Sequence, residues 1–170
     1  MPRPAADEYA KYYDTYVSKV PEENLLAAFE ADYEPTLAFL RSITEPQSLE
    51  LHAPYTWTFR EVLGHILDGE RVFTFRTLWF ARGDQRPLYG FDELDFDKNA
   101  QFKRIPFADL VEEFAHLRKS SILFFKSLPA EAWKRTGIAS DNTVSVNALA
   151  YMTLGHGRHH FNIMKKRIAK

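Results

Sequence analysis

The sequence predicts an all-α protein built as a four-helix bundle. Four amphipathic stretches of helical length run along the chain, each marked by apolar residues spaced three and four apart. No stretch carries a strong strand signal, and one long aperiodic segment, near residues 83–104, separates the second helix from the third. These observations fit two helix pairs joined by a long crossover loop. A chain of 170 residues can bury a core, so one domain is expected over residues 1–170.

The first two helices have recognisable starts. After a tyrosine-rich lead over residues 9–16, a proline opens the first helix, expected over residues 21–42. Thr58 and Glu61 show the capping-box pattern, in which each side chain accepts a hydrogen bond from the other residue's backbone N–H. The second helix is therefore expected to begin at Thr58 and to run to about residue 81.

The crossover near residues 83–104 interleaves aromatic and acidic residues. A connection of this length in a small domain is usually functional or partly structured. It fits a lid over a pocket, and it equally fits a packed crossover between two antiparallel helix pairs. Beyond it, the third helix is expected over residues 106–128 and the fourth over residues 144–168, because Pro106 and the apolar periodicity mark them.

The composition narrows the class of function. A net charge of −1 gives no argument for binding nucleic acid or an anionic membrane. The chain has no cysteine, so it forms no disulfide and no thiolate metal site, and any thiol chemistry needs a thiol co-substrate. No apolar run approaches the length of a membrane span and no signal peptide is visible, so a cytoplasmic location is expected.

Three histidines are the strongest functional signal. His156 and His160 are four residues apart, so they share the apolar face of the fourth helix, while His65 lies on the inward stripe of the second. Three imidazoles from two helices can hold a divalent metal ion and leave one coordination position open. The alternative is three hydrogen-bonded core histidines, but burying them without a shared partner is costly. Gly155 and Gly157 indicate a close approach of another element or a ligand to this helix.

Three further residues are candidates for substrate binding. His159 lies about 60° from His156, on the side away from His160 and at the edge of the same stripe. Arg76 and Trp79 share the inward stripe of His65. A buried guanidinium needs a partner, so Arg76 is expected to line a cavity or to pair with a carboxylate such as Glu61. The alternative is that its charge reaches solvent from the helix end.

No acid–base residue stands out beside the histidines. Asp68 and Glu61 flank the inward stripe of the second helix, and Tyr89 in the crossover could donate a proton. Each of these catalytic candidates has a structural role as its alternative. The spacing of the histidine pair matches that of zinc proteases, but Gly157 occupies the place of their general-base glutamate, which argues against a protease.

Taken in order, these motifs resemble the DinB-like (YfiT-type) metalloenzyme superfamily of bacteria. The residues that carry the resemblance are segments 57–65, 68–73 and 155–160, with Arg76, Gly83 and Asp84. The resemblance implies an up-up-down-down four-helix bundle, often a homodimer. It also implies a divalent metal ion, zinc or nickel, bound by His65, His156 and His160.

The resemblance further implies thiol chemistry or hydrolysis. Characterised members include S-transferases that use bacillithiol or mycothiol, a mycothiol-dependent isomerase, and hydrolases. The leading hypothesis is a metal-dependent S-transferase acting on a small molecule with a low-molecular-weight thiol, whose pKa the metal lowers. The alternatives are a metal-dependent hydrolase and a non-catalytic, stress-related bundle that binds a metal or a small ligand, so catalysis itself is a hypothesis.

Overall fold

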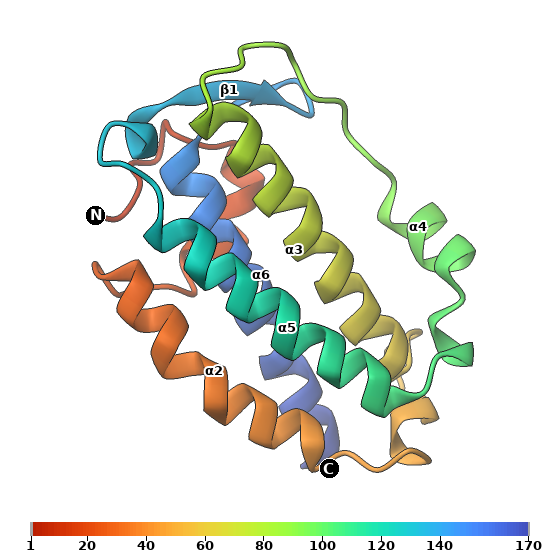
Figure 1. Ribbon diagram of the computed structural model, residues 1–170. Helices are drawn as coiled ribbons and strands as arrows, with labels where there is room; N and C mark the ends of the chain where they lie inside the picture. The colour runs from red at the N-terminus through yellow and green to blue at the C-terminus, as the bar shows by residue number, and fades with distance from the viewer. Residues whose placement is uncertain (1, 170) are drawn as a thin grey trace.

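The computed structural model describes residues 2–169, and four long helices dominate it (Figure 1). These helices are α2 (Leu25–Arg41), α3 (Phe59–Ala81), α5 (Phe107–Lys126) and α6 (Val146–Ile168). The predicted four-helix bundle is confirmed. Within this part of the chain, no helix combines the length and the apolar character of a membrane span. Met1 and Lys170, the ends of the predicted 1–170 domain, lie outside the described residues.

The four helices run two in each direction. In Figure 1, α2 and α6 run one way, while α3 and α5 run the other way. The order along the chain is up, down, down, up. It differs from the expected up-up-down-down order because the connection that runs the length of the bundle is the one between α3 and α5, the second and third bundle helices. The crossover therefore joins two parallel helices, α3 and α5. The antiparallel helices that pack against each other are α3 with α6 and α2 with α5.

Local side chains set the helix ends. The backbone N–H of Glu61 donates to the Thr58 hydroxyl at 3.3 Å, and the N–H of Thr58 donates to the Glu61 carboxylate at 2.8 Å, so the predicted capping box is present. Asn24 and Ser145 cap α2 and α6 by accepting from backbone N–H groups of the first turn. Gly83 follows α3 with φ of 86°, a left-handed conformation that favours glycine.

The crossover between α3 and α5 is partly helical. It contains α4 (Glu93–Ala100) and a 3-10 turn (Phe102–Arg104), and α4 lies along the outside of the bundle (Figure 1). The ring of Phe102 covers Gly64 of α3, where a Cβ atom would lie 2.3 Å from the ring carbon Cγ. This contact needs glycine and fixes the end of the crossover on α3.

A β-hairpin that the sequence pattern did not predict precedes α6. Strands β1 (Thr136–Ala139) and β2 (Asn142–Ser145) pair antiparallel. Between them, Ser140 and Asp141 have φ of 50° and 62°, as a two-residue hairpin turn requires. Each strand has four residues, too few to establish a period, and serine with aspartate is a weaker turn signal than asparagine with glycine. The last helix consequently begins at Val146, two residues later than expected.

The tyrosine-rich lead forms a compact segment that crosses α6. It folds as a 3-10 turn (Lys11–Tyr13) followed by α1 (Asp14–Val17). Its backbone touches α6 at Gly155, where a Cβ atom would lie 2.1 Å from the carbonyl oxygen of Tyr16. The predicted close approach at this glycine is therefore a contact with the N-terminal segment.

The apolar core is divided into two clusters by a polar layer. On α6 the gap between the clusters covers residues 155–160, and on α3 it covers residues 68–72. The layer contains His156 and an ion pair between Glu70 of α3 and Arg118 of α5, all of them buried. The interruption of the apolar stripes therefore coincides with the predicted histidine site.

The Glu70–Arg118 pair satisfies its own charges inside this layer. Nε of Arg118 donates to both carboxylate oxygens, at 3.1 and 3.0 Å, and Nη2 donates to one of them at 2.8 Å. The rings of Phe29 and Phe114 lie 5.2 and 5.0 Å from the guanidinium carbon. Several hydrogen bonds between planar groups are what a fully buried ion pair needs to be tolerated.

Breaking this pair from one side should destabilise the fold strongly. Glu70→Ala leaves Arg118 charged and buried, so we expect the free energy of unfolding to fall by about 3–5 kcal/mol. The matched control is Glu113→Ala, which removes the surface pair with Arg71 and should cost less than about 1 kcal/mol. Urea unfolding followed by circular dichroism measures both losses. Equal and small losses would contradict this account.

Candidate metal centre

Three histidines from two helices meet in the polar layer. His65 comes from α3, while His156 and His160 lie one turn apart on α6. The ring centroids of His65 lie 4.8 Å from each of the other two, which are 4.6 Å from each other. One possible ligand nitrogen from each ring lies within 4.8 Å of the others. The structure thus brings together the three residues that the sequence singled out as metal ligands.

Gly69 of α3 makes this meeting sterically possible. A Cβ atom at position 69 would lie 2.7 Å from Cε1 of His156 and 3.0 Å from its Nδ1. The imidazole therefore occupies the space that the glycine leaves free. The rings of Tyr16 and Phe73 meet this imidazole edge to face, with centroids 5.1 and 5.7 Å away, so they fix its orientation.

Burial keeps the three imidazoles neutral. Loss of hydration lowers the pKa of His65, and it lowers the pKa of His156 well below the usual value. For His160, burial and the neighbouring histidines lower the pKa to about 3. A neutral imidazole keeps a lone pair on one ring nitrogen, and that lone pair is what binds a metal ion.

The donor set fits a divalent metal ion. Nε2 of His160 is buried and has no hydrogen-bond partner among residues 2–169. Nε2 of His156 and Nε2 of His65 are 2.9 Å apart, where only one of them can donate a hydrogen to the other. A divalent ion held by these three residues would satisfy all three rings at once. Imidazole suits both zinc and nickel, so these residues do not choose between them.

A cavity of about 340 Å³ opens onto the three histidines. Besides α3 and α6, connecting segments form its wall: the N-terminal tyrosines, the hairpin residue Ser140, and Phe91, Glu93 and Leu94 of the crossover. The crossover therefore covers part of the site, which agrees with the lid hypothesis. The aromatic lining suits an organic molecule with a few oriented polar groups.

Two of the three predicted substrate-binding residues line this cavity. The ring of His159 lies edge to face with Tyr16 at 5.6 Å, and burial lowers its pKa, with a contribution from the charge of a nearby lysine. Nη2 of Arg76 donates to the carbonyl oxygen of Tyr89 at 3.0 Å and to Oγ of Ser140 at 2.9 Å. Both side chains can therefore reach a bound molecule.

The third predicted residue, Trp79, lies outside the cavity. Its indole N–H donates to the carbonyl oxygen of Arg86 at 3.3 Å, and the Arg86 guanidinium lies over its ring at 4.6 Å. The helical periodicity of the sequence predicts which face of α3 carries Trp79, but it does not report how far along the helix axis the side chain lies from His65. Trp79 follows His65 by fourteen residues, which is about 21 Å along the helix axis.

The three predicted catalytic candidates also lie away from the cavity wall. Glu61 closes the capping box of α3 and pairs with Lys103 at 3.0 Å, so it is not the partner of the arginine in the cavity. Asp68 pairs with Arg71 at 3.3 Å. Tyr89 is 95% exposed, and only its backbone carbonyl contributes to the site. In each case the structural alternative agrees with the observed contacts.

The structure adds the N-terminal tyrosines to the site. Tyr12, Tyr13 and Tyr16 line the cavity, and the hydroxyl oxygens of Tyr12 and Tyr16 lie 3.4 Å apart. Burial and the neighbouring tyrosine raise the pKa of Tyr16, so its phenol stays protonated. With Tyr9, these residues follow the i, i+3, i+4, i+7 spacing of one helical face, a signal that could have revealed their common direction.

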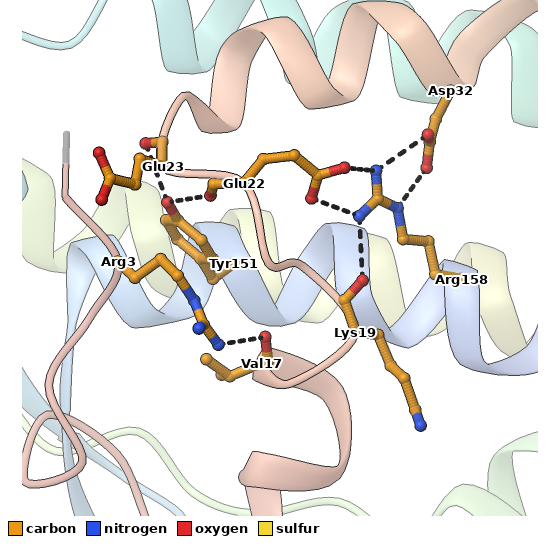
Figure 2. A network of polar contacts seen from close by, with 8 residues as sticks. All are labelled: Arg3, Val17, Lys19, Glu22, Glu23, Asp32, Tyr151 and Arg158. Carbon is orange, nitrogen blue, oxygen red and sulfur yellow. Dashed lines mark hydrogen bonds and ion pairs between the residues drawn. The ribbon is translucent and has the colours of Figure 1, made fainter.

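A polar network holds this N-terminal segment on the bundle (Figure 2). From α6, Arg158 donates to Glu22 at 2.7 Å, to Asp32 at 2.6 Å and to the carbonyl oxygen of Lys19 at 2.9 Å. The Tyr151 hydroxyl donates to the carbonyl oxygen of Glu22 at 2.9 Å. The link between α1 and α2 is thus fastened to α6, which keeps the tyrosines over the histidines.

A family comparison identifies the chain. The family model described as the DinB superfamily matches residues 28–164. The chain belongs to the DinB superfamily. No curated protein matches it.

Two solved structures resemble this DinB-superfamily protein. One is YfiT from Bacillus subtilis, which is described as a probable metal-dependent hydrolase with an unusual four-helix bundle topology. It aligns with a TM-score of 0.68 and 16% sequence identity, and the alignment covers 99% of this chain and 94% of the YfiT chain. The mycothiol-dependent maleylpyruvate isomerase aligns with a TM-score of 0.70 and 14% identity over 89% of this chain. The alignment covers 62% of the isomerase chain. These likenesses establish a shared fold, and the activity has to be argued from the site.

Removing the Arg158 contacts should loosen the N-terminal segment without unfolding the bundle. In Arg158→Gln, we expect the backbone amides of Lys19 and Val20, which donate to carbonyl oxygens of α1, to exchange hydrogen at least about tenfold faster. Hydrogen exchange measured by mass spectrometry tests this, with the amides of α3 as the internal reference. The control is Arg86→Gln, which breaks an exposed pair with Asp84. Unchanged exchange in Arg158→Gln would contradict the proposed fastening.

The metal-free protein should lose stability as the pH falls below about 6.5. An unfolded histidine takes up a proton near that pH, whereas the pKa of His160 is lowered to about 3 in the fold. The unfolded state then binds more protons, so His160 alone lowers stability by about 1.4 kcal/mol per pH unit below 6.5, and the lowered pKa values of His65 and His156 act in the same direction. Urea unfolding with a chelator at pH 7, 6 and 5 measures the slope.

Two variants assign that slope to the site. His160→Gln should flatten it by the share of one histidine, while His116→Gln, at an exposed position on α5, should leave it unchanged. A slope that is the same in all three proteins would show that the buried histidine does not cause the pH dependence.

Proposed function

We propose that the protein is a metal-dependent enzyme that transfers a low-molecular-weight thiol to a small electrophilic molecule. One observation carries the proposal: three neutral histidines from two helices converge at a cavity of about 340 Å³ that all three line. Three protein ligands that face a cavity are typical of catalytic metal sites, whereas structural sites are closed by a fourth ligand.

His65, His156 and His160 are the residues that would hold the ion, zinc or nickel. A divalent ion in this position supplies Lewis acidity that lowers the pKa of an incoming thiol or water. The chain has no cysteine, so the thiol is a separate co-substrate. The name of the mycothiol-dependent isomerase supports this choice of co-substrate.

The other residues of the cavity have separate roles in this proposal. His159 is neutral near pH 7 because its pKa is lowered, so it can accept the proton that the thiol loses. The protonated Tyr16 phenol can donate a hydrogen bond to the electrophile. Trp57 and Phe73 present apolar surface to the reactants and exclude water from them.

Hydrolysis is the second candidate, and the similarity to YfiT favours it. The scarcity of carboxylates in the cavity wall favours thiol transfer over hydrolysis. Among the described residues that line it, Glu93 is the one carboxylate, and its side chain is exposed on α4. In metal-dependent hydrolysis of an amide, a carboxylate commonly carries a proton from the attacking water to the leaving group, whereas addition of a thiolate to an electrophile has no leaving group to protonate. A homodimer and a cytoplasmic location remain predictions.

Removing one histidine should abolish metal binding and turnover together. We expect about one first-row metal ion per chain, lost on chelation, because three ligands define one site. In His65→Ala, elemental analysis should find no ion, and thiol consumption with electrophiles such as 1-chloro-2,4-dinitrobenzene should cease. The control is His116→Ala, which changes an exposed histidine outside the cavity.

The outcomes separate the candidate functions. Thiol consumption that follows metal content across cysteine, glutathione, bacillithiol and mycothiol supports the transferase. Metal-dependent cleavage of esters or amides without thiol consumption assigns a hydrolase. A tightly held ion without turnover of either kind assigns a binding protein, and turnover by metal-free His65→Ala would exclude the metal mechanism.

A further inference from the structure

Arg76 is a buried cation with no carboxylate partner in the wall of the cavity. Its side chain is 3% exposed, and its two hydrogen bonds, to the Tyr89 carbonyl oxygen and to Ser140 Oγ, both come from Nη2. Among residues 2–169, no aspartate or glutamate forms an ion pair with it. A guanidinium carries five N–H donors, so the three on Nε and Nη1 are left without a protein acceptor.

Two of the other three buried arginines among residues 2–169 are paired with a carboxylate. Arg60 pairs with Glu45, and Arg118 pairs with Glu70. Arg167 has no carboxylate either, but the Phe59 ring lies against its guanidinium at 4.4 Å, and it does not line the cavity. Arg76 therefore differs from them, because its free donors belong to a side chain that faces an open space beside the histidines.

Arg76 and the histidines occupy separate parts of one cavity. Arg76 follows His65 by eleven residues, which is about 16 Å along the axis of α3. Helical side chains tilt toward the N-terminus, so the guanidinium points back toward the histidines by part of that distance. Its contact with Ser140 places it at the hairpin turn. A molecule that touches both must be elongated.

We propose that Arg76 binds the carboxylate of an elongated small-molecule substrate whose reacting end lies at His65, His156 and His160. The free N–H groups on Nε and Nη1 can each donate a charge-assisted hydrogen bond to a carboxylate oxygen, while Nη2, which belongs to both bidentate forks of a guanidinium, already donates to Tyr89 and Ser140. A bound anion would also compensate a buried charge that is costly to leave unpaired. The identity of the reacting end rests on the function proposed above, whereas the anion site stands on the contacts of Arg76 alone.

The first test needs neither the true substrate nor a metal ion. Calorimetry compares hexanoate, 1-hexanol and hexyl phosphate on metal-free protein, three probes that share one apolar chain. We expect hexanoate to bind at least about tenfold more tightly than hexanol, because a hydrogen bond between two charged groups is stronger than one to a neutral hydroxyl. Equal binding of the two, or no detectable binding of hexanoate, would overturn the proposal. Tighter binding of hexyl phosphate would overturn the carboxylate assignment.

Variants then assign the preference to Arg76. Arg76→Gln should lose the preference for hexanoate while hexanol binds as before. Ser140→Ala removes one contact of the guanidinium but keeps its charge, so it should retain the preference, and Arg86→Gln changes an exposed arginine paired with Asp84. If Arg76→Gln fails to fold, the proposal is tested by the comparison of hexanoate with hexanol on the wild-type protein and on Arg76→Lys. Lysine keeps the positive charge but not the fixed positions of the Nε and Nη1 donors, so its preference should be reduced but present.

A second titration connects the anion site to the metal centre. On zinc-loaded protein, 6-mercaptohexanoate should bind more tightly than 6-mercapto-1-hexanol, and Arg76→Gln should weaken only the acid. A preference for hexanoate in a protein that binds no metal ion would reject the proposed enzyme function and leave the anion site standing. Metal binding without any preference for the two acids would reject the anion site and leave the proposed enzyme function standing.

Discussion

The close packing of α3 against α6 at Gly69 is the constraint on which the rest of the structure depends. At this point the imidazole of His156 fills the place of the missing side chain. The same approach brings Nε2 of His156 to 2.9 Å from Nε2 of His65. It also interrupts the apolar stripes of both helices, so the core is divided into two clusters with polar groups between them. The site and the division of the core are thus two results of one helix contact.

The charges in the polar layer are arranged so that the histidines remain neutral. The buried ion pair of Glu70 and Arg118 compensates itself, and Gly157 leaves room for it, since a Cβ atom there would lie 3.1 Å from Nη2 of Arg118. Neutral ligands add no negative charge to a site. A divalent ion held by these three imidazoles would therefore keep its full charge, which is what the proposed binding of an anionic ligand such as a thiolate needs.

Helical periodicity was sufficient to predict the bundle and the meeting of His65, His156 and His160, because it reports which residues share one face of a helix. It does not report height along a helix, which is why Trp79 was assigned to the site although it lies beyond the cavity. Periodicity also does not report which charged side chain lies beside a carboxylate, and for this reason the ion pair of Asp68 with Arg71 was not predicted. The hairpin and the position of Tyr16 over His156 follow from contacts between distant parts of the chain, which local sequence does not encode.

The cavity is lined by two kinds of segment, and this has an evolutionary consequence. The three histidines lie on bundle helices, whereas much of the surrounding wall comes from the N-terminal segment, the crossover and the hairpin. Connections tolerate substitution and changes of length far better than packed helices do. A lineage with this architecture can therefore change the molecule that the cavity accepts by altering these three segments, while the histidine cluster and the folding of the bundle are inherited intact.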